Sequence, residues 1–361
     1  MRKLASVRRV GDIFQIEGRD RIELAMIDGW SVIVKKDEFK TGDLCVYCEI
    51  DSVLPEKSEF EFLRSKNFRI KTMKMAGVLS QGICFQMDIL PDGEYAEGQD
   101  VTAILGVTQY EATMDKDPES SAKTAKKPKY PKWLMRWKWF RALVRKKDGC
   151  KESRGFPNFI SKTDETRIQN APFYLAMNEK WVLTEKCDGS SGSYALVKHK
   201  RLFKTQYEFM VCSRNLRIYK NDGSNYWKVA EKYKIKEVLR DMLDKTGYDW
   251  IAIQGEVIAP NIQGNKYRVK EPDLYVFNLI TPYGREGSLD GKNVLEQYGM
   301  KWVPIVSTCA TLPSTVGAML EIAHGDSALG PTIREGLVCR TIDGKHSFKA
   351  VDPLFLIKYD A

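Results

Sequence analysis

The stretch TEKCDGSS, residues 184–191, directly follows the apolar run WVL at 181–183. The next run, at 192–197, again has the composition of a strand. This order predicts that Lys186 lies at the end of a strand with its amine facing a pocket. An Asp-Gly pair is by itself a strong turn signal, so a polar hairpin turn explains the octapeptide equally well. The choice between the two interpretations depends on residues farther along the chain.

The composition is typical of a folded protein of two domains. The chain has 361 residues, of which 43% are hydrophobic and 29% are charged, so it can bury a sizeable core. No apolar run approaches the roughly 18 residues that span a membrane, and the first four residues lack the apolar core of a signal peptide. We therefore expect an intracellular protein without a membrane partner, and we leave cytoplasm or nucleus open.

Cysteine and histidine usage agrees with this expectation. The eight cysteines lie mostly inside apolar runs, as reduced core thiols do. Cys45 and Cys48 form a C-x-x-C pair, but no second pair or nearby histidine completes a zinc site. The three histidines are far apart, so they indicate neither histidine-based catalysis nor a metal cluster.

The net charge of +9 is concentrated in one stretch. Residues 123–147 contain eleven Lys or Arg and no acid, so the rest of the chain carries −2. Apolar side chains recur within this stretch at the spacing of one helical face: Trp133, Trp137, Phe140 and Val144. A basic amphipathic helix can dock between domains, bind nucleic-acid phosphates or lie on a membrane. We favour docking for the apolar stripe and nucleic acid for the charges. The RNA-binding candidates on this helix are Lys138, Arg141 and Arg145.

Residues 1–107 have the pattern of a small all-β domain. The clearest hairpin covers 21–36, with a turn at Asp28-Gly29. Several short strands separated by turns predict a small closed barrel of the oligonucleotide-binding (OB) type. Basic and aromatic side chains could form a nucleic-acid face on this barrel. The candidates are Trp30, Arg69, Lys71 and Lys74.

The rest of the chain follows a connector at 108–155 and mixes α and β patterns. Helices are expected over 226–245 and 314–323. The glycine-rich phosphate loops G-x-G-x-x-G and G-x-x-x-x-G-K-[ST] do not occur in the sequence. The strand-like runs lie at 181–184, 193–197, 209–212, 250–257, 274–279 and 336–341.

The stretches downstream of Lys186 carry the residue types that suit a nucleoside triphosphate with a divalent metal. Acids hold the metal, cations hold phosphates and an aromatic ring stacks on the base. Each residue alone also fits a salt bridge, a core aromatic or a solvated lysine, but together they favour one nucleotide site. The residues are Arg214, Glu256, Phe277, Glu335, Lys349 and Lys358.

The chain resembles a known superfamily at this point. Residues 186–189, KCDG, are similar to the K-x-D-G signature of the covalent nucleotidyltransferases, which include ATP-dependent DNA and RNA ligases and mRNA capping enzymes. The later stretches follow the order of that superfamily's remaining motifs. The resemblance is closest to RNA ligases with an OB-like domain in front, because the N-terminal hairpin, KTGD at 40–43 and TDETRIQN at 163–170 have counterparts there. It covers nearly the whole chain, and five motifs in order are far more specific than K-x-D-G alone.

The resemblance implies an α+β fold in three parts. Residues 1–107 would form the OB-like β-barrel, and 108–155 a basic linker with the amphipathic helix. Residues 156–361 would form a mixed α/β, ATP-grasp-like nucleotidyltransferase domain built on antiparallel sheets.

The resemblance also implies an activity. Lys186 would attack the α-phosphate of ATP, release pyrophosphate and become a lysine-adenylate. The AMP would then pass to an RNA 5′-phosphate, and a 3′-hydroxyl would displace it and seal the strands. Mg²⁺ or Mn²⁺ would be held by Glu335 and Glu256.

The remaining roles come from the same resemblance. Glu185 would contact adenine, with Phe277 stacked on the ring, and Glu256 would reach the ribose or the metal. Lys349 would hold the α-phosphate. Arg167 is a candidate for phosphate or RNA contact. Further nucleotide-binding positions are Asp188, Gly189, Arg214 and Glu335.

The chemistry of lysine supports this assignment. The pKa of a free lysine is about 10.4, which lies about three units above a pH of about 7.4 and corresponds to about 4 kcal/mol. Lysine becomes a nucleophile only where cations or desolvation lower that pKa. A metal at Glu335 together with Lys349 would lower the pKa of Lys186, and both would stabilise charge on the transferring phosphate.

One position departs from the family pattern. Many relatives carry a second lysine two residues after the position matched to Lys349, whereas this chain has Val351. Either Lys358 supplies the charge or the site functions without it.

Three functions remain to be compared. The leading hypothesis is an ATP-dependent RNA ligase that seals nicks in RNA repair, acting as a monomer on RNA that includes nicked duplex. DNA ligases and capping guanylyltransferases usually carry their OB domain after the lysine motif, and we expect none beyond Ala361. A non-catalytic nucleic-acid-binding protein with a degenerate fold is the third, and the intact lysine and acids argue against it.

Overall fold

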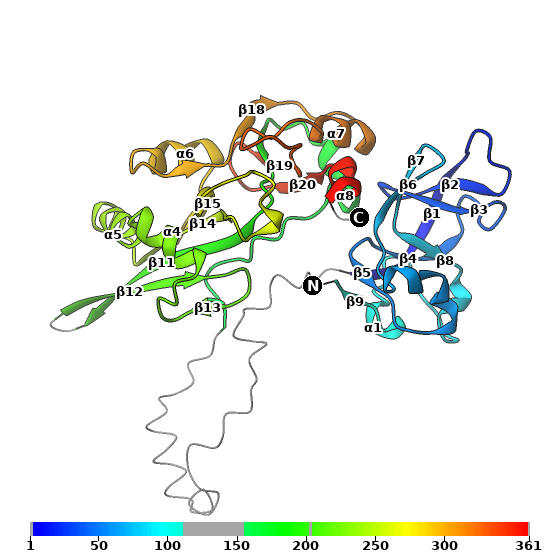
Figure 1. The fold of residues 1–361 in the computed structure, drawn as a ribbon, viewed down its shortest axis with the longest axis horizontal. Coiled ribbons are helices and arrows are strands. Elements are labelled where there is room, and N and C mark those ends of the chain that lie inside the picture. The colour runs from blue at the N-terminus through cyan, green and yellow to red at the C-terminus, as the bar shows by residue number, and fades with distance from the viewer. Residues whose placement is uncertain (1–2, 111–154, 202–203, 360–361) are drawn as a thin grey trace, which may run out of the picture. The chain divides into compact units, whose positions relative to one another are not determined.

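A computed structural model of the protein describes residues 3–110, 155–201 and 204–359 (Figure 1). The basic stretch at 123–147, with its expected helix and the candidates Lys138, Arg141 and Arg145, lies outside the described residues. The chain divides into two compact units. The first unit comprises Met1–Glu111, Glu165–Cys187 and Pro304–Ala361, and the second comprises Ala112–Asp164 and Asp188–Val303. The boundary between the units thus falls inside the KCDG motif, after Cys187.

The N-terminal part of the first unit is a five-stranded antiparallel sheet in the order β3-β2-β1-β4-β8. The hairpin predicted at Asp28-Gly29 is present, with Asp28 at φ 51° as such a tight turn requires. Ser31 Oγ donates to Leu79 O (3.1 Å) and Ile33 N–H to Ser80 Oγ (3.0 Å), which joins β3 to the strand at Val78–Gln81. The strands are β1 Ala5–Gln15, β2 Ile22–Ile27, β3 Trp30–Lys35, β4 Leu44–Cys48 and β8 Ile83–Phe85.

Shorter elements complete this barrel. Two small strand pairs, β5 with β9 and β6 with β7, flank the main sheet. Inward-facing residues of β3, namely Trp30, Val32 and Val34, enter its core. The elements are β5 Ser52–Val53, 3-10 helix Ser58–Lys66, β6 Thr72–Met75, β7 Val78–Gln81, 3-10 helix Met87–Ile89, α1 Thr102–Leu105 and β9 Thr108–Gln109.

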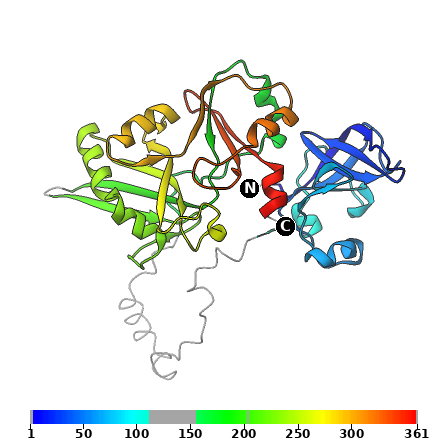
Figure 2. The same cartoon turned by 45° about the horizontal axis from the view of Figure 1, so that its top comes forward.

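The second sheet of the first unit has the order β18-β10-β19-β20. The strand β10, Trp181–Glu185, is buried along its whole length because it has a partner on each side and apolar side chains on both faces. Figure 2 shows α8, in red, after β20. The other elements are 3-10 helices Ile168–Asn170 and Pro172–Ala176, β18 Ile305–Ala310, α7 Val316–Ala323, β19 Gly336–Thr341, β20 Ser347–Val351 and α8 Pro353–Tyr359.

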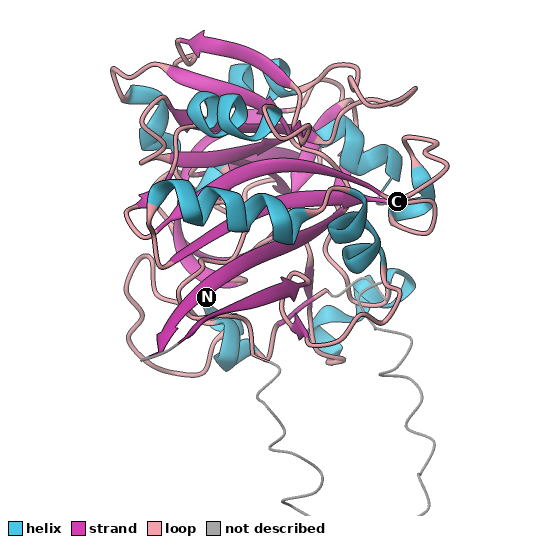
Figure 3. Ribbon diagram, turned by 90° about the vertical axis from the view of Figure 1, so that its left-hand side faces the viewer, coloured by secondary structure: helices cyan, strands magenta, loops and turns pink. Residues whose placement is uncertain are grey.

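The second unit is built on a seven-stranded sheet with the path β13-β12-β11-β14-β15-β16, and β17 joins it beside β15. The pairing of β15 with β17 is parallel, and the other pairings in this sheet are antiparallel. Helices α4 and α5 lie against this sheet (Figures 1 and 3). The strands are β11 Ser190–Arg201, β12 Lys204–Cys212, β13 Arg217–Ile218, β14 Trp250–Ile258, β15 Asp273–Thr281, β16 Gly284–Arg285 and β17 Lys301–Trp302. The helices are α4 Asn225–Lys232, α5 Ile235–Thr246, 3-10 helix Gln263–Asn265 and α6 Ser288–Glu296.

The single helix expected over 226–245 is wrong, because it breaks into α4 and α5 at Lys234. That residue adopts the left-handed conformation, with φ 47°. The buried positions of α4 are Val229 and Ala230, and those of α5 begin at Ile235. At about 100° per residue, one continuous helix would turn these two apolar stripes to opposite sides. The break at Lys234 lets both stripes face the sheet.

The proposed nucleic-acid face of the barrel is wrong for two of its four residues. Trp30 is 0% exposed, and its Nε1–H donates to Asn170 Oδ1 at 2.7 Å. Arg69 is 8% exposed and forms an ion pair with Asp51 at 3.0 Å. Segment 165–170, which belongs to the same unit, thus occupies this part of the barrel. Lys71 is half-buried and Lys74 is exposed.

The described cysteines are free thiols, as expected, and all but Cys309 are buried. Burial raises the pKa of the Cys48 thiol to about 12, so it stays protonated. Among the helices within the described ranges, none is long and apolar enough to cross a membrane.

Candidate active site

The pairing of β10 with β19 brings Lys186 and Glu335 together. Lys186 follows the last residue of β10, and Glu335 precedes the first residue of β19. The two strands run antiparallel, with Glu185 opposite Leu337, and Lys186 N–H donates to Gly336 O at 2.9 Å. The Lys186 amine consequently lies 2.6 Å from Glu335 Oε2. The side chains are 25% and 15% exposed, so a ligand can reach both.

The position of Lys186 at a strand end is therefore confirmed, and the hairpin-turn interpretation is wrong. A hairpin would pair β10 with β11, but these strands belong to different sheets. The Asp188-Gly189 pair instead carries the chain from one sheet to the next. The chain bends at Gly189 but forms no hairpin turn, because the strands on its two sides have other partners.

A glycine permits the close approach of β19 and β20 beside Glu335. Gly336 has φ 151°, and a Cβ atom there would lie 2.1 Å from Ala350 O. Lys349 is on β20 and is half-buried, and its N–H donates to Thr166 O at 2.8 Å. The Lys349 backbone is thus fixed on both sides, by β19 and by the segment that precedes Ile168.

The two positions that bear on the missing lysine lie in different environments. Val351 ends β20 and is 1% exposed. Lys358 is exposed on α8, with its amine 5.0 Å from the centroid of the Tyr359 ring.

Arg167, the upstream candidate, is 8% exposed, and one guanidinium nitrogen lies 3.3 Å from Asp51 Oδ2. The roles of these residues stay predictions.

Glu185 is enclosed by a hairpin that the sequence analysis did not identify. The side chain is 3% exposed. Its Oε1 accepts a hydrogen bond from the Ser327 hydroxyl, and its Oε2 accepts one from Ala328 N–H at 2.9 Å. Burial raises the pKa of Glu185, and the hydrogen bonds from Ser327 and Ala328 and the positive charge of Arg334 oppose this rise. No sequence signal links Ser327 to Glu185, because 142 residues separate them.

In the second unit, Asp188 is held by two residues that the sequence analysis also missed. Its carboxylate forms an ion pair with Lys266, and the two side chains are 12% and 16% exposed. Its N–H donates to the Tyr267 hydroxyl at 2.7 Å. The next residue, Gly189, has no room for a side chain, since a Cβ there would lie 2.6 Å from Val257 O. Asp188 and Gly189 are therefore fixed in one conformation at the start of β11.

The other predicted residues of the second unit lie on or beside the central strands. Glu256 is half-buried on β14, opposite Ser191 of β11. Phe277 lies on β15 where the register with β14 shifts by one residue, a bulge that redirects a side chain. Arg214 is exposed, and its guanidinium lies 3.8 Å from Asp164.

The described residues include no group of three or more His, Cys, Asp or Glu side chains that could hold a metal ion. Glu335 and Glu256 nevertheless supply the carboxylate oxygens that hard divalent cations prefer. Mg²⁺ typically takes only one or two protein carboxylates and completes its shell with phosphate and water oxygens. The partly exposed carboxylate of Glu335 fits a metal of that kind.

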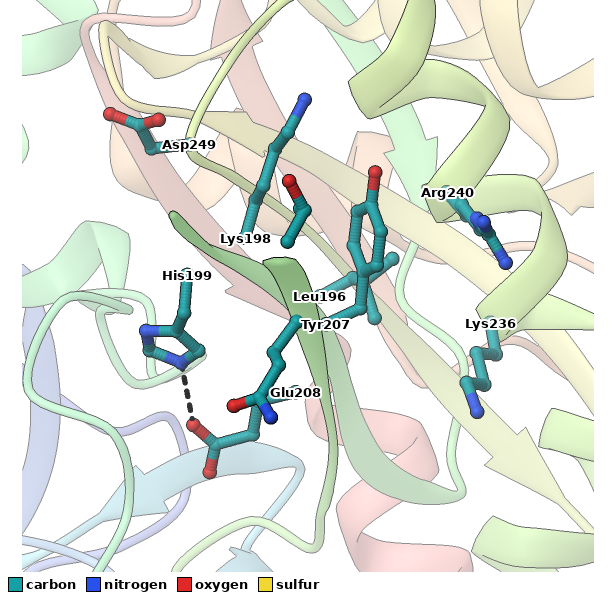
Figure 4. A pocket seen from close by; sticks show the side chains of 10 residues that line it. Leu196, Lys198, His199, Tyr207, Glu208, Lys236, Arg240 and Asp249 are labelled. Atoms are coloured by element: carbon teal, nitrogen blue, oxygen red, sulfur yellow. Dashed lines mark hydrogen bonds and ion pairs between the residues drawn. The ribbon is translucent and has the colours of Figure 1, made fainter. Parts of the chain in front are cut away.

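A pocket of about 1100 Å³ lies elsewhere in the second unit (Figure 4). Its wall includes Lys198 and Tyr207, with the Arg240 guanidinium 5.0 Å from the Tyr207 ring centroid. His199 lies 3.0 Å from Glu208 at its edge. None of the residues that the sequence predicts for nucleotide binding lines this pocket.

A strand-end lysine in a K-x-D-G motif, ion-paired with an acid that directly precedes the neighbouring strand, is the arrangement expected from the resemblance to covalent nucleotidyltransferases. Comparison with known proteins shows which family of this class the chain belongs to. Residues 4–87 match the family model of an OB-fold domain, and residues 179–359 match the family model of RNA ligase. The chain belongs to the RNA ligase family.

Solved structures agree over the whole chain. The Naegleria gruberi RNA ligase with PPi is 31% identical, with a TM-score of 0.79, and the match covers 100% of this chain and 99% of that one. A variant of that ligase with ATP and Mn is 30% identical, covers 100% of both chains and has a TM-score of 0.79. Another variant, with AMP and Mn, is 31% identical, covers 99% of both and also has a TM-score of 0.79. No curated protein matches the chain.

These findings confirm two predictions from the sequence. The fold class is α+β, with an OB-fold domain in front of the nucleotidyltransferase domain. The chain is a ligase of the RNA ligase family, not a DNA ligase or a capping enzyme. The domain limits 1–107, 108–155 and 156–361 and the roles of individual residues stay predictions.

Proposed function

We propose that this chain is an ATP-dependent RNA ligase that joins a 3′-hydroxyl to a 5′-phosphate through a lysine-adenylate at Lys186. The observation that carries the proposal is the 2.6 Å contact between the Lys186 amine and Glu335 at the end of β10. The ATP, AMP, PPi and Mn in structures of the Naegleria gruberi ligase support the same chemistry.

In the first step, the Lys186 amine attacks the α-phosphorus of ATP. A bond forms between Nζ and phosphorus, and the bond from that phosphorus to the pyrophosphate oxygen breaks. The amine must give up a proton before the adenylate forms. A neighbouring carboxylate favours the charged ammonium form, so Lys186 is activated only when the charge of Glu335 is neutralised.

Glu335 is suited to hold a cation that neutralises its own negative charge. Its carboxylate is partly exposed and already lies against a positive charge. Glu256 is the second candidate ligand. A divalent cation, when bound, neutralises charge on the triphosphate and lowers the pKa of the attacking amine. Lys349, whose backbone is fixed in β20, stabilises negative charge on the transferring phosphate.

In the later steps the AMP passes from Lys186 to an RNA 5′-phosphate, and a 3′-hydroxyl attacks that phosphate and releases AMP. The nucleotide contacts assigned to Glu185, Asp188, Gly189, Arg214 and Phe277 follow from the family motifs. Arg167 and the basic residues at 138, 141 and 145 are assigned to RNA.

We further propose that the substrate includes nicked duplex RNA and that the enzyme acts as a monomer in RNA repair. A sealing assay on single-stranded and nicked duplex RNA of one sequence tests the substrate, and light scattering tests the monomer.

The deciding experiment is protein labelling by α-labelled ATP with Mg²⁺ or Mn²⁺, read on a denaturing gel. The protein is first treated with pyrophosphate, which removes AMP already bound to the lysine. Wild type should acquire an acid-labile label from ATP and none from GTP. Lys186→Ala should acquire none, and neither should Lys186→Arg, because a guanidinium stays protonated.

Lys180→Ala is the matched control. Lys180 immediately precedes β10, is exposed and donates to Thr311 Oγ1 at 2.7 Å. It should label like wild type. Absence of label on folded wild type, with Lys186 unmodified, overturns the ligase proposal and leaves a nucleic-acid-binding relative that still binds RNA after Lys186→Ala.

A further inference from the structure

The carboxylate of Glu185 is held from one side by a short hairpin at 325–334. This hairpin connects α7 to β19 and therefore ends directly before Glu335. Its two arms are joined by hydrogen bonds from Arg334 N–H to Gly325 O (2.9 Å) and from Ser327 N–H to Thr332 O (2.8 Å). At its tip, Ser327 and Ala328 contact both oxygens of the buried carboxylate.

The hairpin is anchored at two points away from Glu185. The Arg334 guanidinium donates to the carbonyl oxygens of Ile322, Ala323 and His324 at 2.8–2.9 Å, which are the last carbonyls of α7 and the one that follows. The Thr332 hydroxyl lies 2.6 Å from the Tyr359 hydroxyl at the end of α8. Ser327 is therefore presented to Glu185 by a supported segment, and its Oγ also accepts Leu329 N–H at 3.0 Å.

A carboxylate with two oxygens has about four lone-pair positions. Ser327 and Ala328 use one on each oxygen, so the carboxylate is fixed in orientation and keeps acceptor capacity for a third donor. The 6-amino group of adenine is such a donor. The 6-oxo group of guanine is an acceptor, and a carboxylate that faces it gains no hydrogen bond and repels it.

We infer that Ser327 is a positioning residue that sets the base preference of the nucleotide site by orienting Glu185. This inference rests on the proposed function, and in particular on the contact of Glu185 with adenine that the family motifs imply. Ser327 touches the carboxylate rather than the base. Its loss leaves Glu185 in place but removes one of the two charge-assisted hydrogen bonds that orient the carboxylate.

The burial of Glu185 explains why its carboxylate requires hydrogen-bond donors such as the Ser327 hydroxyl. The charged form of a buried carboxylate is costly unless donors stabilise it. A protonated Glu185 would present an O–H group, which is a donor that guanine O6 can accept. The hydroxyl of Ser327, together with Ala328 N–H, thus favours the form of Glu185 that accepts from adenine.

The test compares full-length wild type with Ser327→Ala, Ser327→Thr and Thr332→Val. For each protein, the initial rate of labelling is measured against the concentration of α-labelled ATP and of α-labelled GTP. Ser327→Ala should raise the half-saturating ATP concentration about tenfold and change the maximal rate less than about twofold. It should also permit labelling by GTP, which wild type does not show. Ser327→Thr keeps a hydroxyl and should restore most of both values.

Thr332→Val separates this role from simple damage to the hairpin. It removes a hydroxyl from the same hairpin, but one that faces Tyr359. The ATP preference should stay at the wild-type value even if the melting temperature falls. An unchanged half-saturating ATP concentration in Ser327→Ala overturns the inference, as does an equal change in Thr332→Val. If wild type acquires no label at all, the proposed function fails instead, so the two failures are distinguishable.

Discussion

The first unit contains two clusters of polar side chains that sequence patterns alone do not separate. The nucleophile cluster consists of Glu185, Lys186, Ser327 and Glu335. The junction cluster, between the barrel and the segment that begins at 165, consists of Trp30, Glu49, Asp51, Arg69, Arg167 and Asn170. Both combine acids with cations, and both were assigned in part to substrate contact.

The clusters differ in exposure and in the type of cation. Arg69 and Arg167 are each 8% exposed and share Asp51 as a partner at 3.0 and 3.3 Å. Lys186 is 25% exposed and has a titratable amine. Arginine stays charged and offers a rigid set of donors, whereas lysine changes its pKa readily and can become a nucleophile. A cluster built for structure therefore buries arginine, and one built for chemistry leaves a lysine within reach of a ligand.

The largest effect should come from the acid of the nucleophile cluster. Glu335→Ala and Glu335→Gln should reduce the rate of lysine adenylation about 10³-fold, which is about 4 kcal/mol of activation free energy. Either change removes a metal ligand, and this loss outweighs the gain from removing the negative charge that keeps Lys186 protonated. The free energy of unfolding should change by less than about 1 kcal/mol, since both side chains can be solvated. Single-turnover labelling and thermal unfolding measure the two quantities, and a loss of less than about tenfold would contradict this role.

The junction cluster should show the opposite pattern. Asp51→Ala removes one partner from two buried arginines, and the free energy of unfolding should fall by about 2 kcal/mol, less than for a fully buried pair because Asp51 is 24% exposed. Adenylation by the folded fraction should stay within about threefold of wild type. Urea unfolding and labelling at a temperature where the variant is folded test this. A large loss of adenylation without a loss of stability would contradict the structural role of the cluster, whereas a loss of RNA sealing alone would fit the RNA contact proposed for Arg167.

The contrast between the clusters also shows which parts of the fold and of the site could be predicted from the sequence. The alternation in Trp30, Val32 and Val34 and the Asp28-Gly29 turn were sufficient to predict the barrel hairpin. The order of the motifs was sufficient to predict the family. The pairing of Lys186 with Glu335 could be expected because both flank strands, but only the register of β10 with β19 establishes it.

The contacts that sequence did not predict are those between residues distant in the chain. The Trp30 side chain is of the type that stacks on bases, yet it is buried and its Nε1–H donates to Asn170 Oδ1, 140 residues away. Lys266 is paired with Asp188 across 78 residues. Periodicity gives the face of a strand that is buried, but not the segment that buries it. The one helix predicted over 226–245 failed for a related reason, since the break at Lys234 has no glycine or proline to mark it.

The smallest expected effect is on the pH dependence of the free energy of unfolding. It distinguishes the hydrogen bond from Ser327 to the charged Glu185 from the one between the neutral hydroxyls of Thr332 and Tyr359. Burial raises the pKa of Glu185 above its ordinary value of 4.5. Well below pH 4.5 the group is protonated in both the folded and unfolded states, so no cost of burying its charge arises. As the pH rises through the window between 4.5 and the folded-state pKa, the unfolded state loses the proton first and stability is lost.

Ser327 opposes that loss, because its hydrogen bond favours the charged form and lowers the pKa of Glu185. Ser327→Ala should therefore cost little at pH values below that window and about 1 kcal/mol more above it, where Glu185 is ionised in the folded state. Thr332→Val breaks a contact between two hydroxyls, and its cost should not change with pH. Urea unfolding of wild type and both variants from about pH 4 to 8 measures this. A cost of Ser327→Ala that stays constant, or that rises equally in Thr332→Val, would mean that the hydroxyl of Ser327 supports the hairpin and not the ionised carboxylate.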